Sequence, residues 1–265
     1  MSDGKTGVGK VLVTGAGGVI GEAVREHLAD RYDLVYLTHR PQDFPSIAAD
    51  IADLDAIRPA FEGVDAVVHL AASPAVETPW DDILPNNIVG TRNVFEAARL
   101  AGVRRVVFAS SNHTIGMNEI DNAPDVYELD DPRVWDEYAE PRPDSYYGVS
   151  KLFGEAIGRM FHDLHGLEVI NLRIGTVRAD DDPTSEKTLT SIPKPLAHLS
   201  MEERRKRSRS TWLSRRDCAE LIARSLEADT DWAVVYGISD NPRQFWSLKS
   251  AREVLGYDPQ DSAPE

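Results

Sequence analysis

The sequence contains a single cysteine, Cys218, and no long apolar run. One thiol excludes an internal disulfide and a cysteine-rich metal site, and we expect no metal cofactor. No stretch reaches the roughly 20 apolar residues of a membrane-spanning helix, and "MSDGKTGVGK" lacks the apolar segment of a signal peptide. We therefore expect a cytoplasmic protein with no membrane partner.

Lysine is also scarce, because only 7 of the 29 basic residues are Lys, whereas 26 of the 44 acidic residues are Asp. The formal net charge is -15. Excess surface carboxylate keeps a protein soluble in strong salt, which is typical of halophiles, so we expect a salt-loving source. A nucleic-acid partner is not expected, since a phosphate backbone requires a broad basic face.

The first two thirds of the chain alternate short apolar runs with longer stretches of helical period. Buried strands are predicted at 10–14, 33–38, 65–70, 104–110 and 167–174. Helices are predicted near 19–30, 53–61, 81–101 and 144–165. This alternation predicts an α/β fold with a doubly wound parallel sheet, the Rossmann fold, whose sites lie beyond the carboxyl ends of the strands.

Beyond Val177 the pattern loosens. Residues 178–200 are polar, contain proline and have no period, which predicts a loop over the sheet edge. A helix near 214–228, a short strand "AVVYG" and a helix near 247–255 complete the chain. We expect a dinucleotide-binding core at 1–177 and a small substrate-binding cap at 178–265 that is not an independent domain.

The segment "VLVTGAGGVIGEAVREHL" is the first that carries chemistry. Glycines after a strand and at the start of a helix let the backbone approach a pyrophosphate, while free N–H groups of the helix face its charge. The pattern predicts a dinucleotide site, although a tight structural turn would have the same spacing. The predicted residues here are Gly15, Gly18, Val19, Ile20 and Gly21.

The end of the second predicted strand bears on the choice between NAD and NADP. An acid there accepts the ribose hydroxyls, whereas a base pairs with the extra phosphate of NADP. The segment "YLTHRP" has no acid, so His39 and Arg40 favour NADP locally, unless Arg40 stacks on the adenine or points to solvent. Asp50 and Ile51 are placed to contact an adenine edge.

Tyr147 and Lys151, in "SYYGVSK", are four residues apart and lie on one face of a predicted helix. Oxidation of a hydroxyl requires a base near neutral pH, and free tyrosine titrates near 10. An ammonium about 4 Å away at an effective dielectric near 20 favours the phenolate by roughly 4 kcal/mol, or about three pKa units. We therefore expect Lys151 to lower the pKa of Tyr147, which acts as the base. Tyr146 is less well placed.

The strand before this helix ends in "ASSNHTIG". Ser111, Asn112 and His113 follow the strand, where a hydroxyl and an amide can hold a substrate oxygen beside the base. Any one of them could equally cap a turn. We expect Ser111 to be catalytic and Asn112 and His113 to bind substrate.

These segments resemble the extended branch of the short-chain dehydrogenase/reductase superfamily. "TGAGGVIG", "HLAA", "NNIVGTRNVFEAA", "ASSNHTIG" and "YGVSK" occur in the order and spacing of that family, over about the first 180 residues. The resemblance implies that Tyr147 is the general base, Lys151 its partner and ribose clamp, and Ser111 the oxygen binder. It adds Leu70, Ala71, Ala72 and Asn87 to the cofactor site, and it implies a homodimer joined by an intersubunit helix bundle.

Within the superfamily the chain is similar to uronate dehydrogenases, whose "SSNHT", "YGVSK", "RIG" and Arg before "STW" recur here. The acidic composition is similar to that of haloarchaeal relatives, which include an NAD-dependent glucose-6-phosphate dehydrogenase. In uronate dehydrogenases one Arg pairs with the substrate carboxylate, and Arg207 matches it. Here a basic run, Arg204 to Arg209, surrounds that position, in a longer loop.

A phosphomonoester carries about -1.5 to -2 charge and three acceptor oxygens, so a group of cations suits it better than a carboxylate. The basic run therefore suggests a sugar phosphate, although a solvated helix end would have the same composition. We expect Arg204, Arg207 and Ser210 to bind substrate, together with Ser73 and Thr176 at the strand ends.

The sequence-based hypothesis is oxidation of the C1 hydroxyl of glucose 6-phosphate to the lactone, with NAD as hydride acceptor and NADP kept open because of Arg40. A uronate or free aldose 1-dehydrogenase is the alternative. A nucleotide-sugar epimerase or dehydratase, which recycles its dinucleotide, and a non-catalytic dinucleotide sensor are further alternatives.

Overall fold

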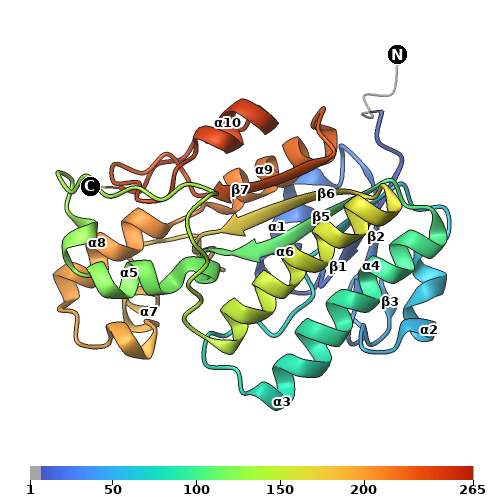
Figure 1. The fold of residues 1–265 in the computed structure, drawn as a ribbon, viewed down its shortest axis with the longest axis horizontal. Coiled ribbons are helices and arrows are strands. Elements are labelled where there is room, and N and C mark those ends of the chain that lie inside the picture. The colour runs from blue at the N-terminus through green and yellow to red at the C-terminus, as the bar shows by residue number, and fades with distance from the viewer. Residues whose placement is uncertain (1–6, 265) are drawn as a thin grey trace.

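A computed structural model describes residues 7–264, and seven parallel strands form the sheet at its centre (Figure 1). Their order is β3-β2-β1-β4-β5-β6-β7, so successive strands are added in opposite directions on either side of the β1/β4 pair. The strands are β1 (Lys10–Thr14), β2 (Asp33–Thr38), β3 (Ile47–Ala48), β4 (Ala66–His69), β5 (Arg105–Ser111), β6 (Glu168–Ile174) and β7 (Trp232–Gly237). The predicted doubly wound Rossmann fold is confirmed.

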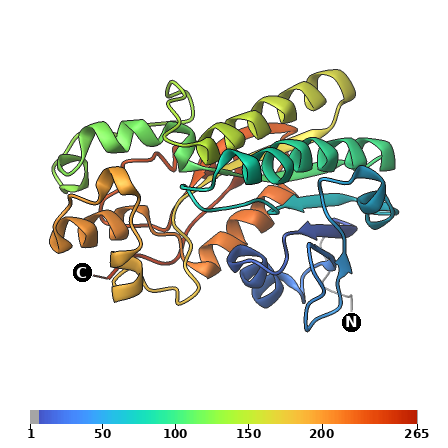
Figure 2. The same ribbon diagram turned by 90° about the horizontal axis from the view of Figure 1, so that it is seen from below.

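Helices cover both faces of this sheet, as the two perpendicular views show (Figure 2). On one face lie α4 and α6, and on the other lie α1 and α9. The helices are α1 (Val19–Leu28), α2 (Leu54–Ile57), α3 (Trp80–Ile83), α4 (Gly90–Ala101), α5 (Gly116–Asn122), α6 (Tyr146–His165), α7 (Glu186–Thr190), α8 (Met201–Thr211), α9 (Arg215–Glu227) and α10 (Lys249–Leu255).

The core is divided by the sheet, because successive side chains of a strand point to opposite faces. In β1, Val11 and Val13 pack into the cluster that includes α1 and α9, whereas Leu12 packs into the cluster under α4 and α6. All three side chains are fully buried. Burial on both faces explains why the strands are continuous apolar runs.

The predicted helix at 81–101 is divided into three parts. α3 is followed by a π-helical turn, η2 (Leu84–Val89), and only then by α4. Pro85 lies in this turn. Proline removes a backbone donor, and single π turns inside helices are often found at functional sites. The turn presents Asn86 and Asn87 toward the segment after β4.

Short 3-10 turns make further connections at η1 (Arg58–Phe61), η3 (Asn112–Ile115), η4 (Asp125–Tyr127) and η5 (Lys194–Leu196). The predicted loop at 178–200 contains α7 and η5, and the basic run that was expected in a loop lies in α8. The helix α5 and the two-residue strand β3 were not predicted. These are short elements, for which hydrophobic period is a weak signal.

The C-terminal part of the chain contributes to the sheet as well as to the end where α5, α7 and α8 gather (Figure 1). β7 pairs with β6 in parallel, and α9 packs against α1. The division into a core at 1–177 and a substrate cap at 178–265 stays a prediction. None of the helices within residues 7–264 has both the length and the apolar character needed to cross a membrane.

Candidate active site

A cleft of about 970 Å³ lies at the carboxyl ends of β1, β2, β4, β5 and β6. Doubly wound sheets bind ligands at this edge, next to the strand pair where the order reverses. The predicted residues on its wall are Gly15, Gly18, Val19, Ile20, Gly21, His39, Arg40, Asp50, Ile51, Leu70, Ala71, Ala72, Ser73, Ser111, Asn112, His113, Tyr147, Lys151, Thr176 and Arg207. Three predicted residues do not line it: Asn87, Arg204 and Ser210.

The turn after β1 has the shape of a phosphate cradle. Gly15 has a φ of +71°, and a Cβ there would lie 2.6 Å from the backbone nitrogen of Ala71. A Cβ at Gly21 would lie 2.6 Å from the backbone of Ala16, so both positions exclude a side chain. Gly18 is the N-cap of α1, whose N–H groups open toward the cleft. These residues fit a dinucleotide pyrophosphate.

The adenosine end of the cleft lies beyond β2 and β3. His39 and Arg40 are exposed, and the backbone carbonyl of Arg40 accepts hydrogen bonds from Thr38 Oγ1 at 2.8 Å and Gln42 Nε2 at 3.1 Å. Asp50 Oδ1 accepts from the backbone N–H of Ala52 at 2.9 Å. Arg40 thus lines the cleft with an exposed side chain, and its contact with a ribose or a phosphate stays a prediction.

Tyr147 and Lys151 lie one turn apart on α6 and both line the cleft. Lys151 Nζ donates to the carbonyl oxygen of Ala109 at 2.7 Å and lies 5.5 Å from the centroid of the Tyr147 ring. Ser145 caps the helix, accepting from the backbone N–H of Gly148 at 3.0 Å. This cap fixes the first turn of α6, which carries Tyr147.

Burial dominates the protonation of this pair. It raises the pKa of Tyr147 to about 12, an effect opposed by a hydrogen bond with Ser111 and reinforced by the charge of Asp144. Burial also lowers the pKa of Lys151 to about 7. The expected net fall in the pKa of Tyr147 is wrong for this structure, because desolvation of the phenol dominates and Lys151, which is itself desolvated, does not offset it.

Ser111, Asn112 and His113 form the wall opposite Tyr147. Ser111 Oγ accepts from the backbone N–H of His113 at 3.2 Å, and the rings of His113 and Tyr147 meet edge to face at 5.8 Å. His113 Nδ1 lies 2.6 Å from Asp144 Oδ2, a partner that the sequence analysis did not identify. Asp144 is buried, yet the bond with His113 keeps the pKa of its carboxyl below the usual value. The histidine ring is thereby fixed against the tyrosine.

The π turn supports the wall after β4. Asn87 lies behind the cleft, where its Oδ1 accepts from the backbone N–H of Ser73 at 2.8 Å and its Nδ2 donates to Ser150 Oγ at 3.0 Å. Asn87 thus joins the Ser73 segment to α6. Its neighbour Asn86 lines the cleft and donates to Ser73 Oγ at 2.9 Å. The two residues of the "NN" pair could not be told apart before the fold was known.

Most of the basic run is paired within the protein. Arg204 donates to the carbonyl oxygens of Leu199 and Ala197 at 2.9 and 2.7 Å, and Ser210 Oγ donates to the backbone carbonyl of Lys206 at 2.8 Å. Arg205 pairs with Glu202 at 3.1 Å, and Lys206 with Glu128 at 2.7 Å. Of residues 204–210, only Arg207 reaches the cleft.

Arg207 is buried and already has a carboxylate partner. Its Nε donates to Glu119 Oε1 at 2.7 Å and its Nη2 to Glu119 Oε2 at 3.4 Å. Tyr127 donates its hydroxyl to Glu119 Oε1 at 2.9 Å. A second arginine, Arg178, lines the same part of the cleft and was missed in the sequence. Its position four residues after β6 was the available signal, since site residues follow strand ends.

Comparison with known proteins agrees with this architecture. Residues 11–235 match the family model described as the NAD dependent epimerase/dehydratase family. An NAD-dependent glucose-6-phosphate dehydrogenase of Haloferax volcanii is 42% identical, over 96% of this chain and 94% of that protein. An L-arabinose 1-dehydrogenase (NAD(P)(+)) of the same organism is also 42% identical, over 96% of this chain and 97% of that protein.

A solved structure, a mutant of uronate dehydrogenase from Agrobacterium tumefaciens complexed with NAD, is 33% identical and superposes with a TM-score of 0.78. That match covers 97% of this chain and 86% of the other. The similarity therefore extends through both the dinucleotide turn and the C-terminal part. This protein belongs to the NAD dependent epimerase/dehydratase family, the extended branch of the short-chain dehydrogenases, and NAD is the cofactor of that family.

Proposed function

We propose that this protein is an NAD-dependent sugar 1-dehydrogenase that oxidises the C1 hydroxyl of glucose 6-phosphate to the lactone. The observation that carries the proposal is the composition of one cleft wall. Arg178 lies in the same cleft as Tyr147, Ser111 and His113, beside an Arg207 that is paired with Glu119, in a chain whose net charge is -15. A cation in the position of Arg178 suits a sugar with an anionic group away from the reacting carbon.

The residues of the chain have separate roles in this reaction. The turn with Gly15, Gly18 and Gly21 would hold the pyrophosphate of NAD. When NAD is bound, its nicotinamide accepts the hydride from the sugar. Tyr147 takes the proton of the C1 hydroxyl, and Ser111 orients that oxygen. His113, fixed by Asp144, and Asn112 complete the wall around the hydroxyl. Lys151, on the next turn of α6, stabilises the phenolate when it is charged.

The alternative substrate is a uronate or a free aldose. It is supported by the relatives that act on arabinose and uronate, and by the match of Arg207 to the arginine that precedes "STW" in uronate dehydrogenases. The Arg207–Glu119 pair weakens the second of these supports, because an Arg207 that already binds a carboxylate has less capacity for that of a uronate.

The test is the rate of NADH formation with glucose 6-phosphate, glucuronate, glucose and arabinose at equal concentration, repeated with NADP. Molar KCl is used because of the acidic surface. We expect oxidation of glucose 6-phosphate at least about tenfold faster, in kcat/KM, than that of the other three sugars. A higher kcat/KM with glucuronate or a free sugar would overturn the assignment of the substrate.

The variant Tyr147→Phe is the control for chemistry. It keeps the aromatic ring and removes the hydroxyl, so we expect kcat to fall by about 1,000-fold or more while NAD still binds. Net NADH formation by the wild type also separates a dehydrogenase from an epimerase, which recycles its cofactor. A Tyr147→Phe variant with full activity would show that Tyr147 is not the base, whereas a wild type that forms no NADH with any of these sugars would revive the non-catalytic role.

A further inference from the structure

We infer that Arg178, held by Ser191, binds the anionic group of the substrate, and that Arg207 does not. This inference rests on the proposed function and names the residue that confers its specificity. It departs from the expectation drawn from the sequence, in which Arg207 binds the substrate anion.

Arg178 lies in the loop after β6, two residues beyond Thr176, and faces the cleft together with Ser191, Ile192 and Pro193. The latter three belong to the segment between α7 and η5. This segment is part of the long connection that has no hydrophobic period in the sequence. Two stretches of the C-terminal part thus meet at the sugar end of the cleft.

The hydrogen bonds of Arg178 leave most of its donors unused. Nη1 donates to Ser191 Oγ at 3.3 Å and Nη2 to the backbone carbonyl of Ser191 at 3.2 Å. Nε is buried and has no partner among the described residues. A guanidinium has five N–H groups. The second N–H of each Nη therefore remains for a ligand, in the fork that matches the oxygens of a phosphate.

The charge of Arg178 is also uncompensated. No carboxylate within residues 7–264 lies within 4.0 Å of its guanidinium. Burial, followed by the positive charge of Arg207, lowers the pKa of this arginine, whereas the charge of Asp180 raises it. A half-buried cation without an anionic partner is costly. An anionic ligand would remove that cost, which makes Arg178 a binding residue rather than a structural one.

Arg207 differs from Arg178 both in its hydrogen bonds and in the compensation of its charge. Its guanidinium has a bidentate carboxylate partner in Glu119, and both side chains are almost fully buried. A substrate anion at Arg207 would have to approach Glu119 as well and would be repelled by it. Glu119 thus neutralises Arg207 and leaves Arg178 as the source of positive potential at this end of the cleft.

The test compares Arg178→Gln with Arg207→Gln and with a matched control, Arg205→Gln, which lies outside the cleft and pairs with exposed Glu202. We expect Arg178→Gln to lower kcat/KM for glucose 6-phosphate by about 10- to 100-fold, chiefly through KM, and for glucose by less than about threefold. Arg205→Gln should match the wild type. If Arg207→Gln rather than Arg178→Gln loses the phosphate substrate selectively, the inference is wrong.

Inorganic phosphate provides a second readout that does not depend on the identity of the sugar. It should inhibit the oxidation of whichever sugar the wild type uses, in competition with that sugar, and Arg178→Gln should weaken this inhibition by about tenfold or more. Should the wild type not oxidise glucose 6-phosphate, the proposed function fails, yet loss of phosphate inhibition in Arg178→Gln would still support the anion site. Unchanged inhibition would overturn it.

Arg178→Lys covers the case in which the glutamine variant does not fold. It keeps the cation but loses the planar fork, and we expect KM for glucose 6-phosphate to rise by about fivefold with little change for glucose. Equal changes for both sugars would assign Arg178 a structural role and contradict the inference.

Discussion

Tyr147 and Lys151 are both desolvated by the wall of the cleft, and desolvation changes their pKa values in opposite directions. The pKa of the tyrosine rises to about 12 and that of the lysine falls to about 7, in each case mainly through burial. A phenol beside a partly neutral amine is a weak base catalyst at neutral pH. The activity of the catalytic pair therefore depends on pH in two ways. A rise in pH increases the phenolate form of Tyr147 but removes the ammonium form of Lys151.

The first dependence concerns Tyr147, whose phenolate increases about tenfold per pH unit below the pKa. We expect kcat/KM for sugar oxidation to rise between about pH 6 and 9. The second concerns Lys151, whose ammonium is present below about pH 7 and lost above it. In Lys151→Met this charge is absent, so the deficit against wild type should be greatest, about 100-fold, near pH 6 and should narrow toward pH 9.

Initial rates across that pH range, in both oxidation and lactone reduction, check the prediction. Lys187→Met, which replaces an exposed lysine of α7, is the matched control and should reproduce the wild-type profile. A deficit of Lys151→Met that stays constant at every pH would assign Lys151 a role independent of its charge.

The residues that were found in the sequence share a local signal. Gly15 follows a strand, and Tyr147 and Lys151 have helical spacing, so short segments sufficed. Asp144 had no such signal, and Arg178 had only its position after a strand, because the importance of both arises from what lies beside them in the folded chain. The pKa of Tyr147 was misjudged for the same reason, since burial is a property of the tertiary structure.

At the scale of elements, the Arg207–Glu119 pair joins α8 to α5. These elements lie close together at one end of the molecule (Figure 1), and α8 itself offers little apolar surface because it consists of "MEERRKRSRST". Ser200 and Glu203 form a capping box that fixes its start. The buried pair, with its distance of 2.7 Å, is therefore a main contact of α8 with the rest of the site.

We expect Glu119→Gln to lower the free energy of unfolding by about 3 kcal/mol, because removal of one member of a buried pair leaves an uncompensated charge. Urea denaturation, monitored by tryptophan fluorescence, measures the change. Glu202→Gln removes the carboxylate of an exposed pair on the same helix and should not alter the transition measurably. If the two variants have the same midpoint, the buried pair does not hold α8.

The long strands and helices followed from hydrophobic period, and their predicted ends lie within about two residues of those observed. The short elements within 178–200 could not be predicted in this way, because the segment has no hydrophobic period. Its helix α7 is a single short turn capped by Ser185, which accepts from the backbone N–H of Thr188 at 3.2 Å. The same segment begins with Arg178 and carries Ser191, to which Arg178 donates. The least predictable element thus contains the groups that we assign to substrate specificity.

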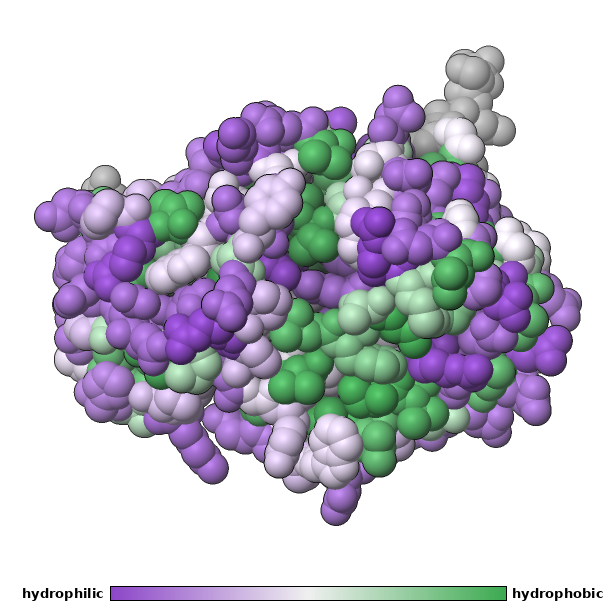
Figure 3. Space-filling view, in the orientation of Figure 1, coloured by the Kyte–Doolittle hydropathy of each residue, from purple (hydrophilic) through white to green (hydrophobic). Residues whose placement is uncertain are grey.

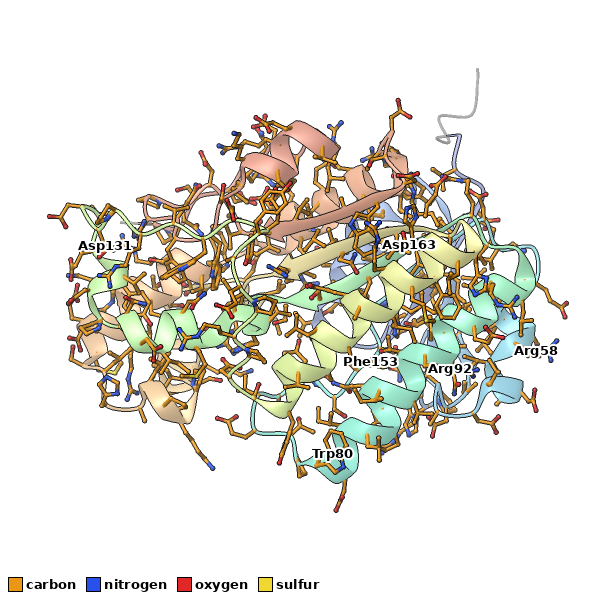
Figure 4. The ribbon with its side chains drawn as sticks, in the orientation of Figure 1. Arg58, Trp80, Arg92, Asp131, Phe153 and Asp163 are labelled. Carbon is orange, nitrogen blue, oxygen red and sulfur yellow. The ribbon has the colours of Figure 1, made fainter. Side chains whose placement is uncertain are left out.

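At the scale of the whole molecule, one face differs from the acidic remainder. Exposed apolar side chains gather over η2, α4 and α6, and Figure 3 shows this apolar area below the centre of the view. We call it the α4/α6 face, and its residues are Leu84, Val89, Leu100, Val149, Met160 and Leu164. In Figure 4, Phe153 on α6 and Arg92 on α4 lie on this same side. Apolar area of this kind on a highly charged protein is typical of an interface.

We propose that the α4/α6 face pairs with a second copy of the chain, as the helix bundle of the superfamily implies. The wild type should then have twice the mass of the 29.3 kDa chain in light scattering at molar KCl. Paired Met160→Glu and Leu164→Glu substitutions, at side chains 44% and 69% exposed, should give a monomer because two charges per copy would be desolvated in the interface.

The control for these substitutions is Leu129→Glu, at a side chain that is 74% exposed and lies near Asp131, at the opposite end from α4. It adds charge and removes an apolar group without touching the α4/α6 face, so the dimer should persist. A monomeric wild type would contradict the proposal outright. A dimer that survives the paired substitutions would place the interface elsewhere. The apolar α4/α6 face would then be exposed to solvent, like the acidic surface around it.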